Sequence, residues 1–169
     1  MGDGGKERSI INTELMFSSK KEDWETPQEL FDELNKEFNF EVDAAASDEN
    51  HKCDIYFKKN PDPFHCDGLT ADWGGHITFC NPPYGREIGK WVRKAYETQK
   101  SAWNYKYKTI VVMLVPARTD TKWFHDYIYN KENVEIRFLK GRLKFGNAKN
   151  SAPFPSMIVV FSGKGSDTN

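Results

Sequence analysis

The amino-acid sequence predicts a layered α/β domain. Segments whose apolar residues recur at helical spacing alternate along the chain with short β-branched apolar runs, as in a sheet covered by helices. One run, 109–115 (TIVVMLV), is apolar without interruption, which indicates a strand buried on both faces, as in a parallel sheet. The 169 residues suffice for one domain with a sizeable core but not for two.

The first element expected is a helix that begins at Thr26. The run 26–29 (TPQE) has the form of a capping box, with proline at the first helical position. Apolar residues then recur at helical spacing as far as Phe38. A short strand at 40–43 follows and ends at an acid, before the small residues 44–47 (AAAS).

The segment 48–70 is expected to be irregular, because its prolines interrupt any regular element. A short apolar strand at 76–80 comes next and stops at the sequence NPPYG. A helix from about residue 87 places its apolar residues on one face. The strand 109–115 closes at Pro116.

The last third of the chain contains one more helix and two strands. The run 119–121 (TDT) offers N-caps for the helix, which carries Trp123, Phe124, Tyr127 and Ile128. Late strands are expected at 134–139 and 157–161, with a proline-marked loop between them.

Composition excludes several classes of protein. Aromatic residues make up 14% of the chain, too many for a disordered one. No apolar run approaches the ~20 residues of a membrane span, and the first six residues, MGDGGK, lack the apolar stretch of a signal peptide. We therefore expect a cytoplasmic protein with one domain at 21–162, between flexible tails at 1–20 and 163–169.

The most informative stretch for chemistry is Asn81-Pro82-Pro83-Tyr84. It lies between a predicted strand and a predicted helix, where ligands bind in open parallel sheets. The Asn81 side-chain oxygen and the Pro82 carbonyl are two acceptors that can bind both N–H groups of an exocyclic base amine. Such binding favours a more pyramidal nitrogen and frees its lone pair for attack. The ring of Tyr84 can stack on a base extruded from a duplex.

Charge is unevenly distributed, although the net charge is −1. Residues 22–49 hold eleven acids and one base, whereas residues 136–150 hold five bases and no acid. This asymmetry favours a surface that faces a polyanion such as nucleic acid. The phosphate contacts predicted are Arg86, Arg118, Lys140, Arg142, Lys144 and Lys149. The alternative is that Arg142 and Lys144 pair with the acidic segment 22–49.

Cysteine and histidine usage predicts no metal site. Cys53, Cys66 and Cys80 are odd in number and form no C-x-x-C pair, so no disulfide framework is implied. His51 and His65 lie near two of these cysteines, at a spacing that fits no common structural zinc site.

The chain resembles the phage-type DNA N6-adenine methyltransferase (Dam-like) family, in which Asn-Pro-Pro-Tyr is the catalytic motif. The resemblance runs from about residue 23 to residue 161. It rests on ordered segments at 23–27 (DWETP), 43–47 (DAAAS), 67–73 (DGLTADW), 81–85 (NPPYG), 114–119 (LVPART), 138–145 (FLKGRLKF) and 151–156 (SAPFPS). It implies a three-layer sandwich of the Rossmann-like methyltransferase type. It also implies methyl transfer from S-adenosylmethionine to N6 of a flipped-out adenine in DNA.

The resemblance also implies residue roles. Residues 81–84 hold the target adenine. The implied cofactor contacts are Trp24, Thr26, Pro27, Asp43, Ala44, Ala45, Ser47, Asp67 and Asp72. The chain departs from the general methyltransferase pattern at 44–47, where a glycine-rich loop is usual. It has no room for a separate recognition domain, so recognition comes from loops, from a homodimer partner or from low specificity. A role in phage DNA protection or in restriction–modification is implied by the resemblance only.

Other functions stay open on the residues alone. The same amine chemistry serves cytosine N4, an RNA base or a protein glutamine amide. The chain can also be a non-catalytic nucleic-acid-binding module of the same fold, or a scaffold protein in which Asn-Pro-Pro-Tyr is incidental.

Overall fold

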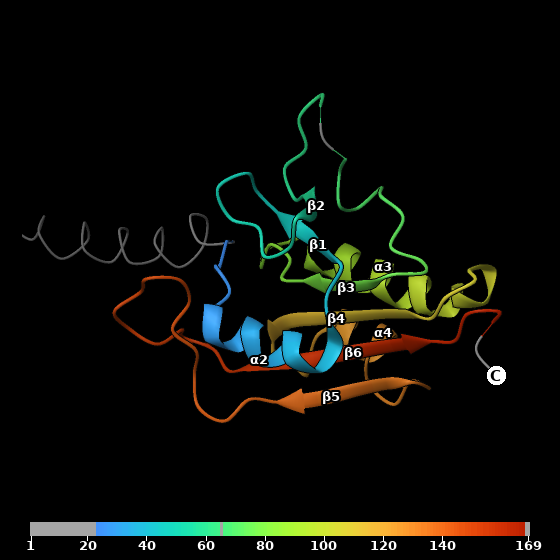
Figure 1. Ribbon diagram of the computed structural model, residues 1–169. Helices are drawn as coiled ribbons and strands as arrows, with labels where there is room; N and C mark the ends of the chain where they lie inside the picture. Colours follow the sequence, from blue (N-terminus) through green and yellow to red (C-terminus); the bar gives the residue numbers. More distant parts are fainter. Residues whose placement is uncertain (1–22, 65, 168–169) are drawn as a thin grey trace, which may run out of the picture.

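The computed structural model describes residues 23–64 and 66–167 and contains a six-stranded sheet with helices on both faces (Figure 1). The strands are β1 (Val42–Ala46), β2 (Ile55–Lys58), β3 (Ile77–Cys80), β4 (Thr109–Pro116), β5 (Val134–Phe138) and β6 (Ser156–Gly163). Helix α2 (Gln28–Phe38) lies in front of the sheet, and helices α3 (Ile88–Lys100) and α4 (Lys122–Tyr127) lie behind it. A short 3-10 helix, η1 (Ala102–Asn104), follows α3. The predicted α/β class is confirmed.

The strand order in the sheet is β2-β1-β3-β4-β6-β5. β1 to β4 are parallel neighbours, whereas β6 runs antiparallel between β4 and β5. The parallel strands therefore end at one edge of the sheet, which we call the carboxyl edge, and begin at the opposite amino edge. The loop 139–155 lies at the carboxyl edge, the side toward which β3 and β4 point in Figure 1.

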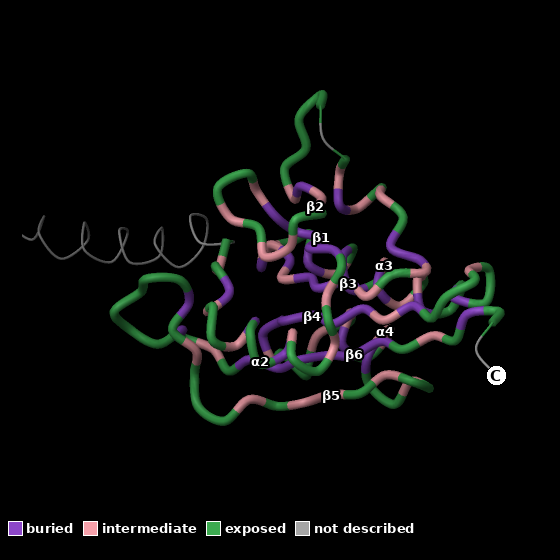
Figure 2. Tube along the Cα trace, viewed as in Figure 1, coloured by how far each residue is buried: buried purple, intermediate pink, exposed green. Residues whose placement is uncertain are grey.

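The core is centred on β4 and β6, where Figure 2 shows continuous burial. Residues 111–115 of β4 are fully buried on both faces, as their apolar run predicts. On the front face, the Phe79 ring of β3 packs against Phe31 of α2 at 5.2 Å between ring centres. Behind the sheet, Trp91 of α3 is buried and stacks on Trp73. Because helices pack on both faces of the sheet, the carboxyl ends of the strands are held in place relative to the helices.

The capping box expected at Thr26 does not form. α2 begins at Gln28, its N-cap is Pro27, and no side chain caps it. Thr26 is buried instead, and its hydroxyl accepts a hydrogen bond from the Asn81 side chain at 2.9 Å. The tertiary contact has therefore replaced the local one that a Thr-x-x-Glu pattern usually signals.

Two other expectations for the first half of the chain are wrong. The strand expected at 40–43 lies farther along, so 44–46 is a buried part of β1 and not the close-packed turn that the family resemblance implies. β2 forms inside the segment 48–70 that was expected to be irregular. As the edge strand, β2 is largely exposed or half-buried, so it shows no continuous apolar run that could have announced it.

The remaining elements agree with the sequence prediction within one or two residues. Glu87 is the N-cap of α3, and the Thr121 hydroxyl caps α4 by accepting the N–H of Phe124. The segment expected as a flexible tail from residue 163 makes defined contacts, because the N–H groups of Ser166 and Asp167 donate to the carbonyls of Tyr105 and Lys106. The tail expected at 1–20 lies outside the described residues. No helix in the described ranges is long and apolar enough to cross a membrane.

Candidate active site

Asn81 stands at the carboxyl edge, directly after the last residue of β3. The two prolines that follow it turn the chain from β3 toward α3. Pro82 and Tyr84 are buried and Asn81 is half-buried, so the turn is packed into the protein and not displayed on its surface. The motif therefore occupies the place between strand and helix that the sequence predicts for it.

The Asn81 amide is held in one orientation. Its Nδ2 donates one hydrogen bond to the Trp24 carbonyl and a second to the Thr26 hydroxyl. The Trp24 carbonyl can only accept, so the NH₂ group and not the oxygen must face it. The opposite atom, Oδ1, is buried and has no hydrogen-bond partner among the described residues.

An unpaired buried acceptor is unusual in a native protein. Leaving such a group without a partner costs about 1–3 kcal/mol, and most buried polar atoms find one. At Asn81 the cost persists because two bonds fix the amide from the other side. The arrangement leaves an oxygen available to an N–H donor that residues 23–64 and 66–167 do not supply.

The Pro82 carbonyl is a second acceptor beside it. The next residue, Pro83, has no N–H, and no donor within 23–64 or 66–167 reaches the Pro82 oxygen. The two oxygens expected to bind an amine thus lie on consecutive residues and lack competing partners among the described residues.

Tyr84 is more enclosed than the sequence suggested. Only 6% of it is exposed, its hydroxyl donates to the Leu114 carbonyl at 2.9 Å, and burial raises the pKa of the phenol well above its usual value. Its ring meets the rings of Phe145 and Phe154 edge-on, and Trp24 meets the same two rings. We call these four residues, Trp24, Tyr84, Phe145 and Phe154, the aromatic cluster.

Phe145 and Phe154 were not predicted as site residues. Both come from the loop 139–155, which the Gly146 N–H joins to the Glu25 carbonyl at 2.8 Å. Their sequence signal was present but weak, since each lies next to a glycine or a proline in a segment without helical or strand periodicity. The loop brings them over the motif only in the folded chain.

A small polar cavity lies beside Asn81. It is lined by Trp24, Thr26, Asp43, Ala45, Asn50, Lys52, Lys59, Phe79 and Asn81. Its volume is about 20 Å³, enough for about one water molecule. The cavity brings together five of the residues predicted for the site. It also adds two lysines that the sequence prediction missed, because they follow or border the unpredicted strand β2.

These two lysines have loose surface partners. Lys59 pairs with Asp23 at 2.9 Å, and the Lys52 ammonium donates to the Gln28 side chain at 2.8 Å. Asp23 and Gln28 are exposed. Long lysine side chains can leave exposed partners at a small cost in free energy.

Asp43 is buried within β1 and acts on its own chain. One carboxylate oxygen accepts the N–H of Lys52 at 2.9 Å and the other accepts that of Ala45 at 3.3 Å. Burial raises the pKa of the Asp43 carboxyl, although these two backbone bonds act in the opposite direction. The carboxylate thereby ties the segment 47–52 to the sheet beside Asn81.

The other predicted cofactor residues fall into two groups. Ala44, Ser47 and Pro27 lie within two residues in sequence of residues that line the cavity. The Ser47 hydroxyl accepts the N–H of Asn50 at 3.1 Å. Asp67 lies by the end of β2, where it accepts the N–H of Leu69.

Asp72 is not brought to this site. It precedes β3 and accepts from the Tyr105 hydroxyl at 2.6 Å, and Tyr105 itself precedes β4. Asp72 therefore lies at the amino edge, separated from Asn81 by the length of the strands.

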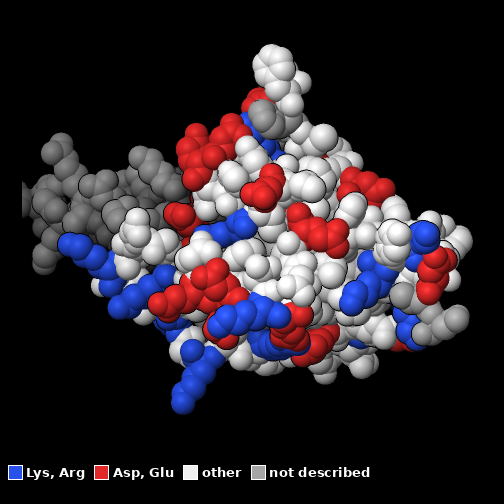
Figure 3. Space-filling view, viewed as in Figure 1, with Lys and Arg blue, Asp and Glu red and all other residues white. Residues whose placement is uncertain are grey.

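The predicted phosphate contacts are all exposed, and none forms an ion pair with a described residue. They are Arg86, Arg118, Lys140, Arg142, Lys144 and Lys149. Figure 3 shows basic side chains on the side of the molecule where the loop 139–155 lies. Within the basic segment 136–150, Arg137 pairs with the acidic segment 22–49 and holds Glu37 through two bonds of 2.6 and 2.7 Å. The alternative pairing expected for Arg142 and Lys144 is absent from the described residues.

Metal ligands do not gather in the part of the chain that the structure describes. No three His, Cys, Asp or Glu side chains there are placed to hold an ion. Cys80 is buried and Cys53 is half-buried, and burial raises the pKa of the Cys53 thiol to about 12. These two thiols thus have the character of packed residues, whereas Cys66 is exposed.

The raised pKa of Asp43 predicts a pH effect on stability. Its neutral form is favoured in the folded state, so this contribution is complete below the unfolded pKa of about 4 and is lost as pH rises through the folded pKa. We expect the free energy of unfolding of the wild type, relative to Asp43→Asn, to fall by up to about 1.4 kcal/mol per pH unit above pH 4. Urea unfolding of both proteins between pH 3.5 and pH 7 measures this difference. A difference that is constant or rises with pH contradicts the assignment.

The chain is similar to known proteins over most of its length. The model of the family described as DNA N-6-adenine-methyltransferase (Dam) matches residues 14–163. A curated relative, the DNA N-6-adenine-methyltransferase of Haemophilus phage HP1 (strain HP1c1), is 27% identical over 153 residues. The aligned region covers 86% of this chain and 82% of the relative.

Proposed function

The chain belongs to the DNA N-6-adenine-methyltransferase (Dam) family, and on that premise we propose how it works as a DNA adenine N6-methyltransferase. The methyl donor is S-adenosylmethionine, and the acceptor is the N6 amine of an adenine that has left the DNA duplex. The fold is of the Rossmann-like methyltransferase type. The observation that carries the proposal is the buried, unpaired Oδ1 of Asn81, whose amide is anchored through Nδ2.

Asn81 and Pro82 activate the amine by geometry. The Asn81 Oδ1 and the Pro82 carbonyl accept the two N–H groups of the adenine amine, which draws the nitrogen toward a tetrahedral shape. Its lone pair then leaves conjugation with the ring and becomes available for attack. Two fixed acceptors in a site shielded from water stabilise this charge distribution without a strong base. The proton released from the nitrogen departs to water.

The residues around the small cavity suit the methionine end of the cofactor. Bound S-adenosylmethionine supplies a methyl group activated by a positively charged sulfonium. Lys52 and Lys59 would hold its carboxylate, and the ring of Trp24 would face its cationic part. The cavity is narrower than the cofactor, so binding requires Lys52 and Lys59 to leave Gln28 and Asp23, the exposed partners that now hold them.

The target base needs space that the aromatic cluster now fills. Tyr84 is 6% exposed and its ring is covered by Phe145 and Phe154. We propose that an adenine reaches Tyr84 when the loop 139–155 swings outward. Gly141 and Gly146 both have positive φ, at 75° and 55°, so the loop contains two positions suited to a backbone change. Separating a few aromatic edges costs little free energy compared with the stacking free energy that a flipped base gains.

The same loop carries the basic side chains that would contact DNA. Lys140, Arg142 and Lys144 are exposed on it and lack ion-pair partners among the described residues. Arg118 lies at the end of β4 with its guanidinium 5.9 Å from the Phe154 ring centre. We propose that phosphate contacts by these residues and the movement of Phe154 and Phe145 occur together as DNA binds.

The central test identifies the methylated nucleoside. Wild-type protein and Asn81→Ala are incubated with methyl-labelled S-adenosylmethionine and unmethylated DNA, and the digested nucleosides are identified by mass. We expect N6-methyladenine from the wild type and a rate at least about 100-fold lower from Asn81→Ala, as when a key polar group of a catalytic site is removed. Asn104→Ala, an exposed asparagine in η1, is the matched control and should keep the wild-type rate.

Other products would change the proposal. Label in cytosine N4, RNA or protein would keep the amine chemistry and replace the substrate. Cofactor binding without any label in nucleic acid or protein, or equal rates for Asn81→Ala and the wild type, would contradict the assigned role of Asn81.

Thr26 is predicted to position Asn81. Thr26→Val removes the hydroxyl that accepts from Nδ2 while keeping the shape of the side chain. The amide then loses one of its two anchors, so we expect kcat to fall about tenfold with little change in the KM for DNA. Thr26→Ser retains the acceptor and should restore kcat. Steady-state kinetics of the three proteins measure this; equal kcat values, or a change confined to KM, would show that the Trp24 carbonyl suffices.

The basic loop is predicted to set the salt dependence of binding. Each of Lys140→Ala, Arg142→Ala and Lys144→Ala should lower the slope of log K against log salt on duplex DNA by about 0.9. Filter binding or anisotropy over a range of salt concentrations measures the slope. Lys122→Ala, an exposed lysine on α4 that pairs with Asp126, is the control. A slope that none of the loop variants alters would exclude this surface.

A further inference from the structure

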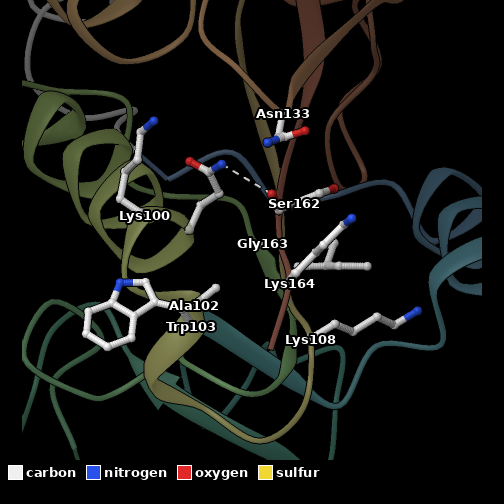
Figure 4. A pocket seen from close by; sticks show the side chains of 10 residues that line it. Lys100, Ala102, Trp103, Lys108, Asn133, Ser162, Gly163 and Lys164 are labelled. Carbon is white, nitrogen blue, oxygen red and sulfur yellow. Dashed lines mark hydrogen bonds between the residues drawn. The ribbon is translucent and has the colours of Figure 1, made fainter. Parts of the chain in front are cut away.

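A second and larger cavity lies at the amino edge of the sheet (Figure 4). Its volume is about 480 Å³, within the range of cavities that hold small ligands or single nucleotides. It is bounded by the end of α3, by η1, by the start of β4 and by the end of β6. None of the residues that line it takes part in the proposed methyl transfer.

The cavity is separate from the candidate active site. Asn81 lies at the carboxyl edge, whereas Lys108 and Ile110 line the cavity where β4 begins. The eight residues of β4 span about 23 Å between the two edges. A ligand in this cavity therefore does not touch the aromatic cluster.

The cavity is basic. Lys100, Lys108 and Lys164 line it, and none of the described acidic residues does. None of the three forms an ion pair within the part of the chain that the structure describes. Figure 4 shows Lys100 on one side of the cavity and Lys108 and Lys164 on the other. Cations placed on opposite walls without counter-charges favour an anionic occupant.

Two further groups make the cavity more than a basic patch. Trp103 stands at the rim and is 71% exposed, which is unusual for the largest aromatic side chain. Gln99 is 6% exposed and lines the wall; its Nε2 donates to the Ser162 carbonyl at 3.2 Å, and its Oε1 is buried with no partner among the described residues. The site thus combines ammonium groups, a free aromatic face and a buried acceptor.

We propose that this cavity is a second nucleic-acid contact, which binds a phosphate and the neighbouring base of a single strand. The lysines hold phosphate oxygens, Trp103 stacks on the base, and Gln99 accepts an N–H or O–H from the base or sugar after a small opening of the wall. A strand fits better than a free nucleotide, because it carries separate phosphates to lysines on opposite walls. Lysines beside an aromatic platform are the usual means of binding single strands without sequence preference.

The inference takes DNA as the polymer from the proposed function but does not require methyl transfer. Cys80 pairs with Met113, so Asn81 lies level with Leu114, roughly 13–20 Å along β4 from Ile110 and Lys108. A contact at that distance would hold a part of the DNA that the catalytic motif does not touch. It would extend the bound surface beyond the basic loop.

The test uses a fluorescent ten-residue oligo(dT), which contains no adenine, and the full chain without cofactor. We expect the Lys108→Ala/Lys164→Ala double variant to make the negative slope of log K against log salt shallower by about 1.4. Each lost contact on a single strand contributes about 0.7 to its magnitude. Trp103→Ala should weaken binding about tenfold. The matched control is Lys36→Ala/Lys122→Ala, two exposed lysines on other surfaces, and it should leave both quantities unchanged.

Each outcome decides the proposal. Losses confined to the cavity variants support it, and displacement of the oligo by dTMP but not by equal inorganic phosphate assigns the base contact to the same place. Equal losses for cavity and control variants, or none, overturn it in favour of diffuse charge attraction. The methylation rate of each variant on a short duplex is measured in parallel, so that loss of oligo(dT) binding with intact methylation is distinguishable from failure of the enzyme itself. Far-UV circular dichroism confirms that each variant is folded.

Discussion

The candidate site depends on a hydrogen-bonded link between two parts of the chain more than fifty residues apart. The Asn81 amide donates to the Trp24 carbonyl and to the Thr26 hydroxyl. These two bonds join the segment before α2 to the end of β3 and leave one oxygen without a partner in the part of the chain that the structure describes. Because a carbonyl and a hydroxyl on the same short segment both accept from one NH₂ group, the amide cannot rotate without losing both. The direction in which the acceptor points is thus a property of the fold.

Everything around that link is arranged to keep it in place. α2 packs on the front of the sheet through Phe31 and Phe79, which holds the start of the helix and so Thr26 near β3. Asp43 ties the segment 47–52 to β1 on the neighbouring side. The loop 139–155 closes the top through the aromatic cluster and the bond from Gly146 to Glu25. The loop is held to its neighbours by these aromatic contacts and by backbone bonds, among them those from Gly146 to Glu25 and from Ala117 to Pro155.

The two edges of the sheet have different characters. The carboxyl edge holds the Asn-Pro-Pro-Tyr motif, the small polar cavity and the loop 139–155, whose lysines and Arg142 form no ion pair with a described residue. The amino edge gathers a larger cavity with lysines and an exposed tryptophan. Parallel strands separate these edges by their own length, so one small domain can offer two chemically distinct surfaces to a long polyanion such as DNA.

The sequence alone determined the α/β class, the strand before and the helix after Asn81, and the buried strand β4, because apolar periodicity and a strand-turn-helix motif are local signals. It did not determine the partner of Thr26, whose capping pattern is equally local but was overridden by a contact with Asn81. Nor did it show β2, an edge strand without an apolar run, or the separation of Asp72 from Asp43. Only the tertiary structure decided these, since hydrogen bonds and cavities between distant segments depend on how layers pack and leave no periodic trace in the chain.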